Sequence, residues 1–358
     1  MILSRLNLQN FRSYSKAAFD FFPQTTLITG PNACGKTNLI EAIYLLATGK
    51  SFRAERENEV IQWGKELSIV SCQLRDKDGE KSLEVRASPG EVVGRKTPRK
   101  NYLVNGIARR MIDFVGNLRA VLFWPEDLEL VTGSPSLRRK YLDSVLVQVD
   151  REYRRNLFSY ERGLRQRNRL LDFINEGKAS RSQLGFWNQL LIRSGGYLTD
   201  KREEFIHFVN SYQLSAVNYQ LEYAKSIISE SRLEQYKNEE IAAKATLVGP
   251  HRDDFIFQFS KENQRLELSK YGSRGEQRLA VLWLKLAELD FMEERSRETG
   301  SGSSRPILLL DDIFSELDEE HRSLVWDLTH RQQTIIASAD PHVIPKLSRK
   351  EVTTIALP

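Results

Sequence analysis

The chain has 358 residues, of which 40% are hydrophobic and 28% are charged, as in an average globular protein. No stretch approaches the roughly 18 consecutive apolar residues of a membrane-spanning helix, so we expect no membrane partner. The 53 basic and 48 acidic residues leave a net charge of +5. This modest excess favours nucleic acid only slightly as a partner.

The first residues of the chain and its two cysteines indicate the cellular compartment in which the protein is expected. Residues 1–5 contain no basic segment ahead of an apolar core, so nothing there resembles a secretory signal. Cys34 and Cys72 are too few for a disulfide framework or a four-ligand zinc site. We therefore expect a cytoplasmic protein in a reducing environment.

The first 50 residues have the pattern strand, loop, helix. Apolar and polar residues alternate over 2–11, and a second apolar run at 25–29 leads directly into a turn containing glycine, proline and asparagine. From 37 to 46 the apolar residues recur with the spacing of a helix.

Residues 67–124 contain short alternating runs, which predict a mainly antiparallel sheet. Asp78-Gly79 and Asn105-Gly106 are strong turn signals between them. Between 92 and 112 there is no acidic residue, and the pattern fits either a solvated hairpin or a DNA contact. The basic residues there are Arg95, Lys96, Arg99, Lys100, Arg109 and Arg110.

From 137 to 171 apolar residues recur every three or four positions, which predicts one long helix of roughly 50 Å. Helical patterning continues to about residue 240. Residues 151–205 have a basic excess that indicates either a solvated helix face or DNA binding. We therefore expect a helical lobe at 136–245, inserted into an α/β head formed by 1–135 and 246–358.

β-Character returns after Gly249-Pro250 with the alternating phenylalanines of 255–259. A helix over about 275–295, an apolar strand at 307–310, another helix and a strand at 334–337 complete the predicted elements.

The most specific motif runs from residue 30 to 37 and matches G-x-x-x-x-G-K-[ST]. Its glycines let the backbone amides form a cup, and the following helix adds the positive end of its dipole, which together suit a triphosphate. Lys36 would reach the β- and γ-phosphates, and Thr37 would bind Mg²⁺. The nucleotide-binding residues are therefore Gly30, Pro31, Asn32, Ala33, Cys34, Gly35, Lys36 and Thr37.

Two carboxylates follow the apolar strand at 307–310. The end of a buried parallel strand is where nucleotides bind in α/β sheets. We expect Asp311 to face Mg²⁺ and Asp312 to orient or deprotonate the attacking water, so that Asp312 and Lys36 are the catalytic residues. A surface turn after a strand is the alternative for both acids.

A third motif, at 271–278, precedes the helix before that strand. On its own it indicates only a capped helix. The order of the motifs along the chain resembles that of the ATP-binding-cassette ATPases, including the SMC-like group. The order is P-loop, long insertion, Ser-x-Gly-Glu, strand ending in two acids, and then residues 315–318. That resemblance implies contact with the γ-phosphate of a second subunit through Ser273, Arg274, Gly275 and Glu276.

Further strings resemble the RecF family of this group over essentially the whole chain. They are Leu6 to Tyr14, Phe123 to Leu128, Arg138 to Asp143 and Val248 to Phe255. The resemblance implies a P-loop ATPase head of ABC/SMC-like fold with a helical insert lobe. It allows Arg12 to approach the phosphates, and an exposed arginine at the end of the strand is the alternative. Three departures are Ala33 in place of glycine, which requires a loop without positive φ there, Glu276 in place of glutamine, and Ala337-Ser338-Ala339 in place of a threonine-rich segment.

The resemblance also implies a function. ATP and Mg²⁺ would join two subunits into a dimer that closes on double-stranded, gapped or junction DNA and reopens after weak, DNA-stimulated hydrolysis. With RecO and RecR such proteins promote RecA loading in recombinational repair, replication restart and the SOS response. A non-hydrolysing ATP-gated DNA scaffold and, as a weaker alternative, a transporter ATPase subunit remain open.

Overall fold

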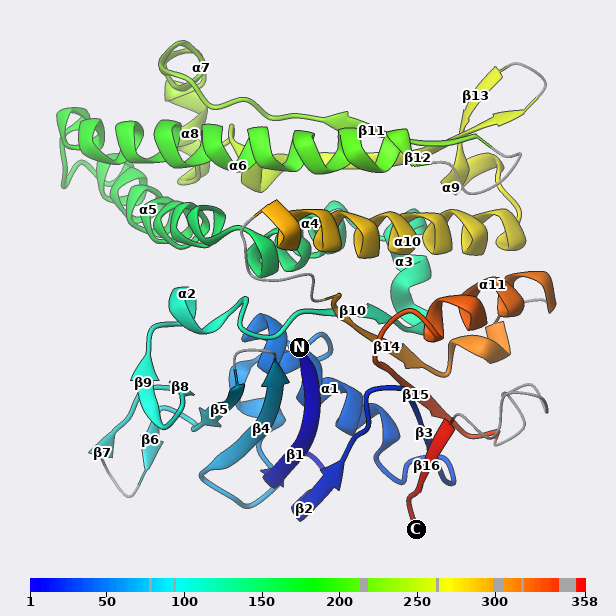
Figure 1. Cartoon of the computed structure of the whole chain (residues 1–358). Helices are drawn as coiled ribbons and strands as arrows, with labels where there is room; N and C mark the ends of the chain where they lie inside the picture. The colour runs from blue at the N-terminus through cyan, green and yellow to red at the C-terminus, as the bar shows by residue number, and fades with distance from the viewer. Residues whose placement is uncertain are drawn as a thin grey trace. The chain divides into compact units, whose positions relative to one another are not determined.

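The computed structural model describes most of the chain (Figure 1). The residues described are 1–76, 79–92, 95–212, 218–261, 264–298, 305–316, 319–340 and 352–358. They form two compact units, one of Met1–Asp127 with Glu288–Pro358 and one of Leu128–Ala287. Within this part of the chain no helix combines the length and the apolar character needed to cross a bilayer.

The first unit contains a six-stranded antiparallel sheet in the order β2-β1-β4-β5-β8-β9. Its strands are β1 (Ile2–Phe11), β2 (Tyr14–Asp20), β4 (Ser68–Asp76), β5 (Gly79–Ala87), β8 (Lys100–Val104) and β9 (Ile107–Arg109). Alternate residues of β1, such as Leu6 and Leu8, are buried, as the sequence pattern predicts. The expected antiparallel region is confirmed up to residue 109. A separate ribbon pairs β6 (Glu91–Val92) with β7 (Arg95–Lys96).

The hairpin between β8 and β9 confirms the prediction at Asn105-Gly106. Both residues have positive φ, 51° and 75°, and Val104 faces Ile107 directly across the turn. Two consecutive left-handed residues are what a two-residue hairpin loop requires. Of the other predicted turn, Asp78 lies outside the described residues, while Gly79 has a φ of 124° and pairs with Asp76.

A five-stranded parallel sheet forms the other layer of the first unit, in the order β10-β14-β15-β3-β16. Its strands are β10 (Ala120–Phe123), β14 (Ile307–Asp311), β15 (Thr334–Ser338), β3 (Thr25–Thr29) and β16 (Val352–Ala356). All residues of β10, β14 and β15 are buried, which is typical of a parallel sheet covered on both faces. Residues 120–123, expected in the antiparallel sheet, belong here instead.

Helix α1 (Lys36–Thr48) contacts β10, β14 and β15 and follows β3 after the loop of residues 30–35. Because the strands are parallel, the carboxyl ends of β3 and β14 lie at the same edge of the sheet. The segments that follow these ends are the glycine-rich loop and the two acids. The shorter helices of this unit are η1 (Glu57–Val60), α2 (Met111–Phe114), η5 (Ile313–Glu316) and α11 (Glu319–Thr329).

The second unit is built on α4 (Pro135–Val149), α5 (Arg151–Asn175) and α6 (Gly185–Ser211). The prediction of one continuous helix over 137–171 is wrong, because the helix is interrupted at Asp150. This residue is extended, with φ −122° and ψ 111°, and its carboxylate accepts hydrogen bonds from the amides of Glu152 and Tyr153. Asp150 therefore caps α5, and apolar spacing alone does not reveal such a break.

A strand missed by the sequence analysis, β11 (Tyr219–Ala224), pairs with β12 (Asp254–Lys261), which pairs with β13 (Gln264–Glu267). In this sheet β12, which follows the expected lobe of 136–245, pairs with β11, which lies within it. The second unit accordingly includes 128–135 and 246–287 in addition to the expected 136–245. Its short helices are α3 (Glu129–Thr132), η3 (Arg181–Leu184), α7 (Glu230–Gln235), α8 (Lys237–Ala243), η4 (Pro250–Arg252) and α9 (Leu268–Tyr271). Helices η2 (Pro125–Leu128) and α10 (Arg274–Glu298) cross the boundaries.

A buried ionic network holds the second unit together. Asp253 is fully buried and accepts hydrogen bonds from Arg202 at 3.0 Å, Tyr223 at 2.5 Å and the amide of Ser226 at 2.7 Å. Arg202 also donates to Asp143 of α4 at 2.8 Å. Since a buried ion pair that loses one member leaves an uncompensated charge, this network requires α4, α6 and β11 to stay together.

Candidate nucleotide-binding site

The loop between β3 and α1 requires glycine at two positions. Gly30 has a φ of 155°, and a Cβ there would lie 2.8 Å from Cys34 Sγ and from the Leu357 carbonyl oxygen. Gly35, with φ 108°, precedes α1, and a Cβ there would lie 2.9 Å from the Tyr14 hydroxyl. These close approaches leave no room for a side chain, so the backbone itself forms the lining of the loop.

The backbone conformation of Ala33 differs from the one predicted from the sequence. An alanine at residue 33 predicts a loop without positive φ there, but Ala33 has a φ of 67°. An alanine in the left-handed region costs roughly 1–2 kcal/mol that glycine avoids. The loop thus keeps a geometry suited to glycine despite the substitution.

Lys36 points back into the loop that precedes it. Its Nζ donates to the carbonyl oxygens of Gly30 at 2.8 Å and Pro31 at 2.9 Å and lies 4.0 Å from Cys34 Sγ. The ammonium group is therefore held at the positive end of α1, where an anion would gain from both the charge and the helix dipole. Asn32 and Ala33 are exposed at the tip of the loop.

Thr37 and Asp311 meet although 274 positions separate them. The Thr37 hydroxyl donates to Asp311 Oδ1 at 3.1 Å, and Asp311 is 4% exposed. Burial raises the pKa of Asp311 to about 6, Asp312 and Glu126 add to this effect, and the Thr37 hydrogen bond and Arg53 oppose it. A buried carboxylate beside a hydroxyl is an oxygen donor set of the kind Mg²⁺ prefers, so the residues present fit this ion. Among the described residues no group of three or more His, Cys, Asp or Glu side chains forms a separate metal site.

Asp312 is exposed and has an unusual backbone conformation. Its φ is 51°, and its amide donates to the carbonyl of Ala337 at the end of β15 at 2.9 Å. Left-handed conformations of non-glycine residues are costly and persist where the surrounding structure imposes them. The structure thereby places Asp312 beside the 337–339 segment, whose Ser338 hydroxyl accepts a hydrogen bond from the Asp340 amide.

Arg12 lies at the edge of this site but is held by α1. Its guanidinium donates to both carboxylate oxygens of Glu41, at 2.6 to 3.1 Å, and to the Glu59 carbonyl at 2.7 Å. Ser51 and Arg53 also donate to Glu41, which is fully buried. Burial by itself raises the pKa of Glu41, but the hydrogen bonds from these three residues outweigh it and hold the pKa below its ordinary value.

Glu41 and Arg53 were not found from the sequence. The available signal was an acid within the apolar run of α1, where Leu39, Ile40 and Ala42 are also buried. A charge at such a position needs a partner, but nothing local to the helix indicates that the partners are Arg12 and Arg53.

The predicted signature residues lie in the second unit, at the start of α10. Glu276 accepts hydrogen bonds from the amide of Ser273 at 2.7 Å and its hydroxyl at 2.8 Å, while the Glu276 amide donates back to Ser273 Oγ at 3.3 Å. This reciprocal pair is a capping box, and it lowers the pKa of Glu276. Ser273, Arg274 and Gly275 are exposed, while of the predicted 315–318 segment Leu317 and Asp318 fall outside the described residues.

The predicted DNA contacts of the first unit divide into two groups. Lys96 and Arg99 are exposed, whereas the side chain of Arg95 lies outside the described part. Lys100 is 8% exposed, forms an ion pair with Glu57 and donates to the Gly49 carbonyl at 2.9 Å. The expectation of a DNA contact at Lys100 is therefore corrected, because the side chain instead fastens β8 to the end of α1.

Comparisons with known proteins agree with this architecture. Residues 2–355 match the family described as RecF/RecN/SMC N terminal domain. The DNA replication and repair protein RecF of Roseiflexus castenholzii is 36% identical over 379 residues, covering 94% of this chain and 93% of that protein.

Two solved structures are also similar. The recombination mediator protein RecF-ATP, from the RecFOR pathway, aligns with a TM-score of 0.85 and 29% identity, covering 96% of this chain and 93% of that one. The Smc head domain from Pyrococcus furiosus, at a TM-score of 0.52 and 17% identity with 99% and 94% coverage, shares the fold alone. By sequence and by fold, the chain belongs to the RecF family within the RecF/RecN/SMC group.

Proposed function

We propose that this protein binds ATP with Mg²⁺ at the loop of residues 30–37, hydrolyses it slowly, and uses the nucleotide to control a DNA-bound dimer. The observation that carries the proposal is the meeting of Thr37 and Asp311 at 3.1 Å, next in the chain to Lys36, whose ammonium group is held in the preceding loop. This places a cation, a hydroxyl and a buried carboxylate at one edge of the parallel sheet. Such a set matches the charge of a metal-bound triphosphate.

Each residue would have a separate part in the reaction. Thr37 and Asp311 would hold Mg²⁺, which when bound neutralises charge developing on the phosphates. Lys36 would exchange the carbonyls of Gly30 and Pro31 for phosphate oxygens. Asp312 would orient the attacking water or accept its proton, a contribution typically of about 10²–10⁴-fold in rate.

Ser273, Arg274 and Gly275 would contact the γ-phosphate bound by a second copy, so that ATP joins the two subunits. Their exposure at the N-terminus of α10, where backbone amides suit an anion, supports this assignment. Glu276 engages the Ser273 hydroxyl, so the closing step would have to release or share this hydrogen bond. A dimer of this kind, acting in the cytoplasm on gapped or junction DNA, would support recombinational repair, replication restart and the SOS response with RecO and RecR, by promoting RecA loading.

Steady-state hydrolysis and sedimentation test the proposal together. Asp312→Asn should still bind ATP, lose about 10²–10⁴-fold in turnover, and accumulate as a dimer at saturating ATP. Lys36→Arg should lose nucleotide affinity. Asp20→Asn, the same chemical change at an exposed carboxylate, serves as the control and should behave as wild type.

Two results would contradict the mechanism. A monomeric Asp312→Asn protein at saturating ATP would refute the sandwich of two subunits. A wild-type protein that dimerises on ATP without any turnover would instead support the non-hydrolysing scaffold. A separate experiment tests DNA binding. Charge reversal at Lys96 and Arg99 should lower the affinity for DNA of any base sequence, because these side chains would contact phosphates and not bases.

A further inference from the structure

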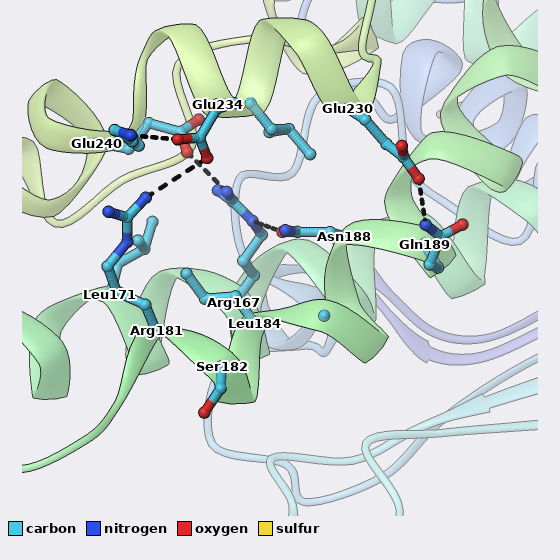
Figure 2. A pocket seen from close by; sticks show the side chains of 13 residues that line it. Arg167, Leu171, Arg181, Ser182, Leu184, Asn188, Gln189, Glu230, Glu234 and Glu240 are labelled. Carbon is cyan, nitrogen blue, oxygen red and sulfur yellow. Dashed lines mark hydrogen bonds and ion pairs between the residues drawn. The ribbon is translucent and has the colours of Figure 1, made fainter.

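Helix α5 carries seven arginines, two of which point into the second unit. Arg154 is 8% exposed and donates to the Val147 carbonyl. Arg167 is 2% exposed and donates to Thr246 at 2.8 Å. It also donates to Asn188 at 2.8 Å and to Glu240 at 2.6 Å (Figure 2). These two side chains stabilise the fold and are not available to a ligand.

Arg167 lines a cavity of about 560 Å³ whose lining has equal numbers of basic and acidic residues, each with a polar partner. Arg181 and Lys237 both pair with Glu234, and Gln189 donates to Glu230 at 2.6 Å (Figure 2). The lining therefore favours no ligand of either sign, and the cavity is not the feature of α5 that points to a partner.

The remaining five arginines of α5 are all exposed, and we call them the arginine stripe. They are Arg151, Arg155, Arg162, Arg165 and Arg169. At 3.6 residues per turn they fall within an arc of about 80° and extend over about 27 Å of the helix. Phe158, 55% exposed, and Phe173, 37% exposed, lie in the same arc.

The charge at the centre of the stripe, at Arg162 and Arg165, is not neutralised by the residues that the structure describes. Arg155 pairs with the exposed Glu152, and the Arg169 guanidinium lies 5.4 Å from the centre of the Phe173 ring. Within the described part of the chain, Arg162 and Arg165 form no ion pair or side-chain hydrogen bond. The exposed residues of the neighbouring α6 have both signs, so the excess charge is confined to α5. They include Arg193, Asp200 and Glu203.

We infer that the arginine stripe binds the sugar–phosphate backbone of DNA. A duplex carries one negative charge per roughly 1.7 Å, so a segment as long as the stripe presents about 16 phosphates to five guanidinium groups. Guanidinium binds phosphate through two parallel hydrogen bonds, and a row of such groups along one face of a helix matches a linear polyanion. The inference rests on the proposed DNA-binding function and adds a surface on the second unit, separate from Lys96 and Arg99 of the first.

The test compares two double variants that lose the same charge. Arg162→Gln/Arg165→Gln removes the centre of the stripe, and Arg193→Gln/Arg75→Gln removes two exposed arginines elsewhere. Fluorescence anisotropy of a labelled duplex of about 20 base pairs, with ATP and Mg²⁺ present, gives the affinity at several salt concentrations. Nucleotide affinity and thermal unfolding of each variant verify that it is folded.

We expect the stripe variant to bind DNA more weakly than wild type. Its plot of log affinity against log salt concentration should be less steep, by about 0.9 for each phosphate that is no longer neutralised. If each of the two arginines neutralises one phosphate, the ratio of wild-type to variant affinity should fall about 12-fold between 50 and 200 mM salt. The control variant should keep the wild-type slope. If the stripe variant binds DNA as wild type does, the stripe is a solvated face or a contact for an acidic protein, and the inference is overturned. If wild type itself binds no DNA, the proposed function fails instead.

Discussion

Replacing Asp311 with asparagine should stabilise the nucleotide-free protein at neutral pH, although it removes an expected magnesium ligand. Burial raises the pKa of this carboxyl from 3.8 to about 6. Between these values the folded chain binds more protons than the unfolded chain at this site. The free energy of unfolding contributed by Asp311 therefore falls as pH rises from about 4 to about 6, by about 3 kcal/mol for a shift of about two pH units.

Urea denaturation of wild type and Asp311→Asn over this range measures the effect. Near pH 4 both side chains are neutral, and the two proteins should be about equally stable. Near pH 7 the variant should be more stable by up to about 3 kcal/mol, since asparagine keeps a carbonyl for the Thr37 hydroxyl. Using the difference between the two proteins removes the contribution of every other carboxylate.

Asp20→Asn is the matched control, because Asp20 is 66% exposed and its ion pair with Arg5 spans 3.6 Å. Its stability difference should remain within about 1 kcal/mol at every pH. The stability difference between wild type and Asp311→Asn could instead be as independent of pH as that of the control. The Asp311 carboxyl of the nucleotide-free protein would then be either exposed to solvent or balanced by a positive charge. Asp311 would then not be the buried cation ligand proposed above.

Four further outcomes can be measured. In wild type, the affinity for magnesium nucleotide should rise with pH through about 6, because Asp311 must lose its proton to bind the ion, as calorimetry would show. Ala33→Gly should raise stability in urea by up to about 1 kcal/mol, and a lower stability would contradict the strain at φ 67°. Glu41→Gln should cost about 3–5 kcal/mol, whereas Glu80→Gln, in an exposed ion pair, should cost under about 1 kcal/mol. Asp150→Ala should cost about 1 kcal/mol by thermal unfolding, unless the cap of α5 is dispensable.

Local signals determined much of this protein from the sequence alone. The glycine-rich loop, the apolar strand ending in Asp311 and Asp312, and the Asn105-Gly106 hairpin are each specified by neighbouring residues. Their backbone preferences and spacing act over a few positions, so reading them requires no knowledge of distant contacts. The same holds for the capping geometry at Ser273, which follows from a serine three residues before a glutamate.

Only the tertiary structure decided which of these residues meet and which are buried. Thr37 and Asp311 approach each other because parallel strands share an edge, and Arg12 is held by Glu41 because two strands and a helix bring them together. Lys100 looks like its exposed basic neighbours in sequence, yet folding places it against Glu57. Burial and pairing depend on residues far away in the chain, and so the chemistry of a charged side chain depends on the whole fold.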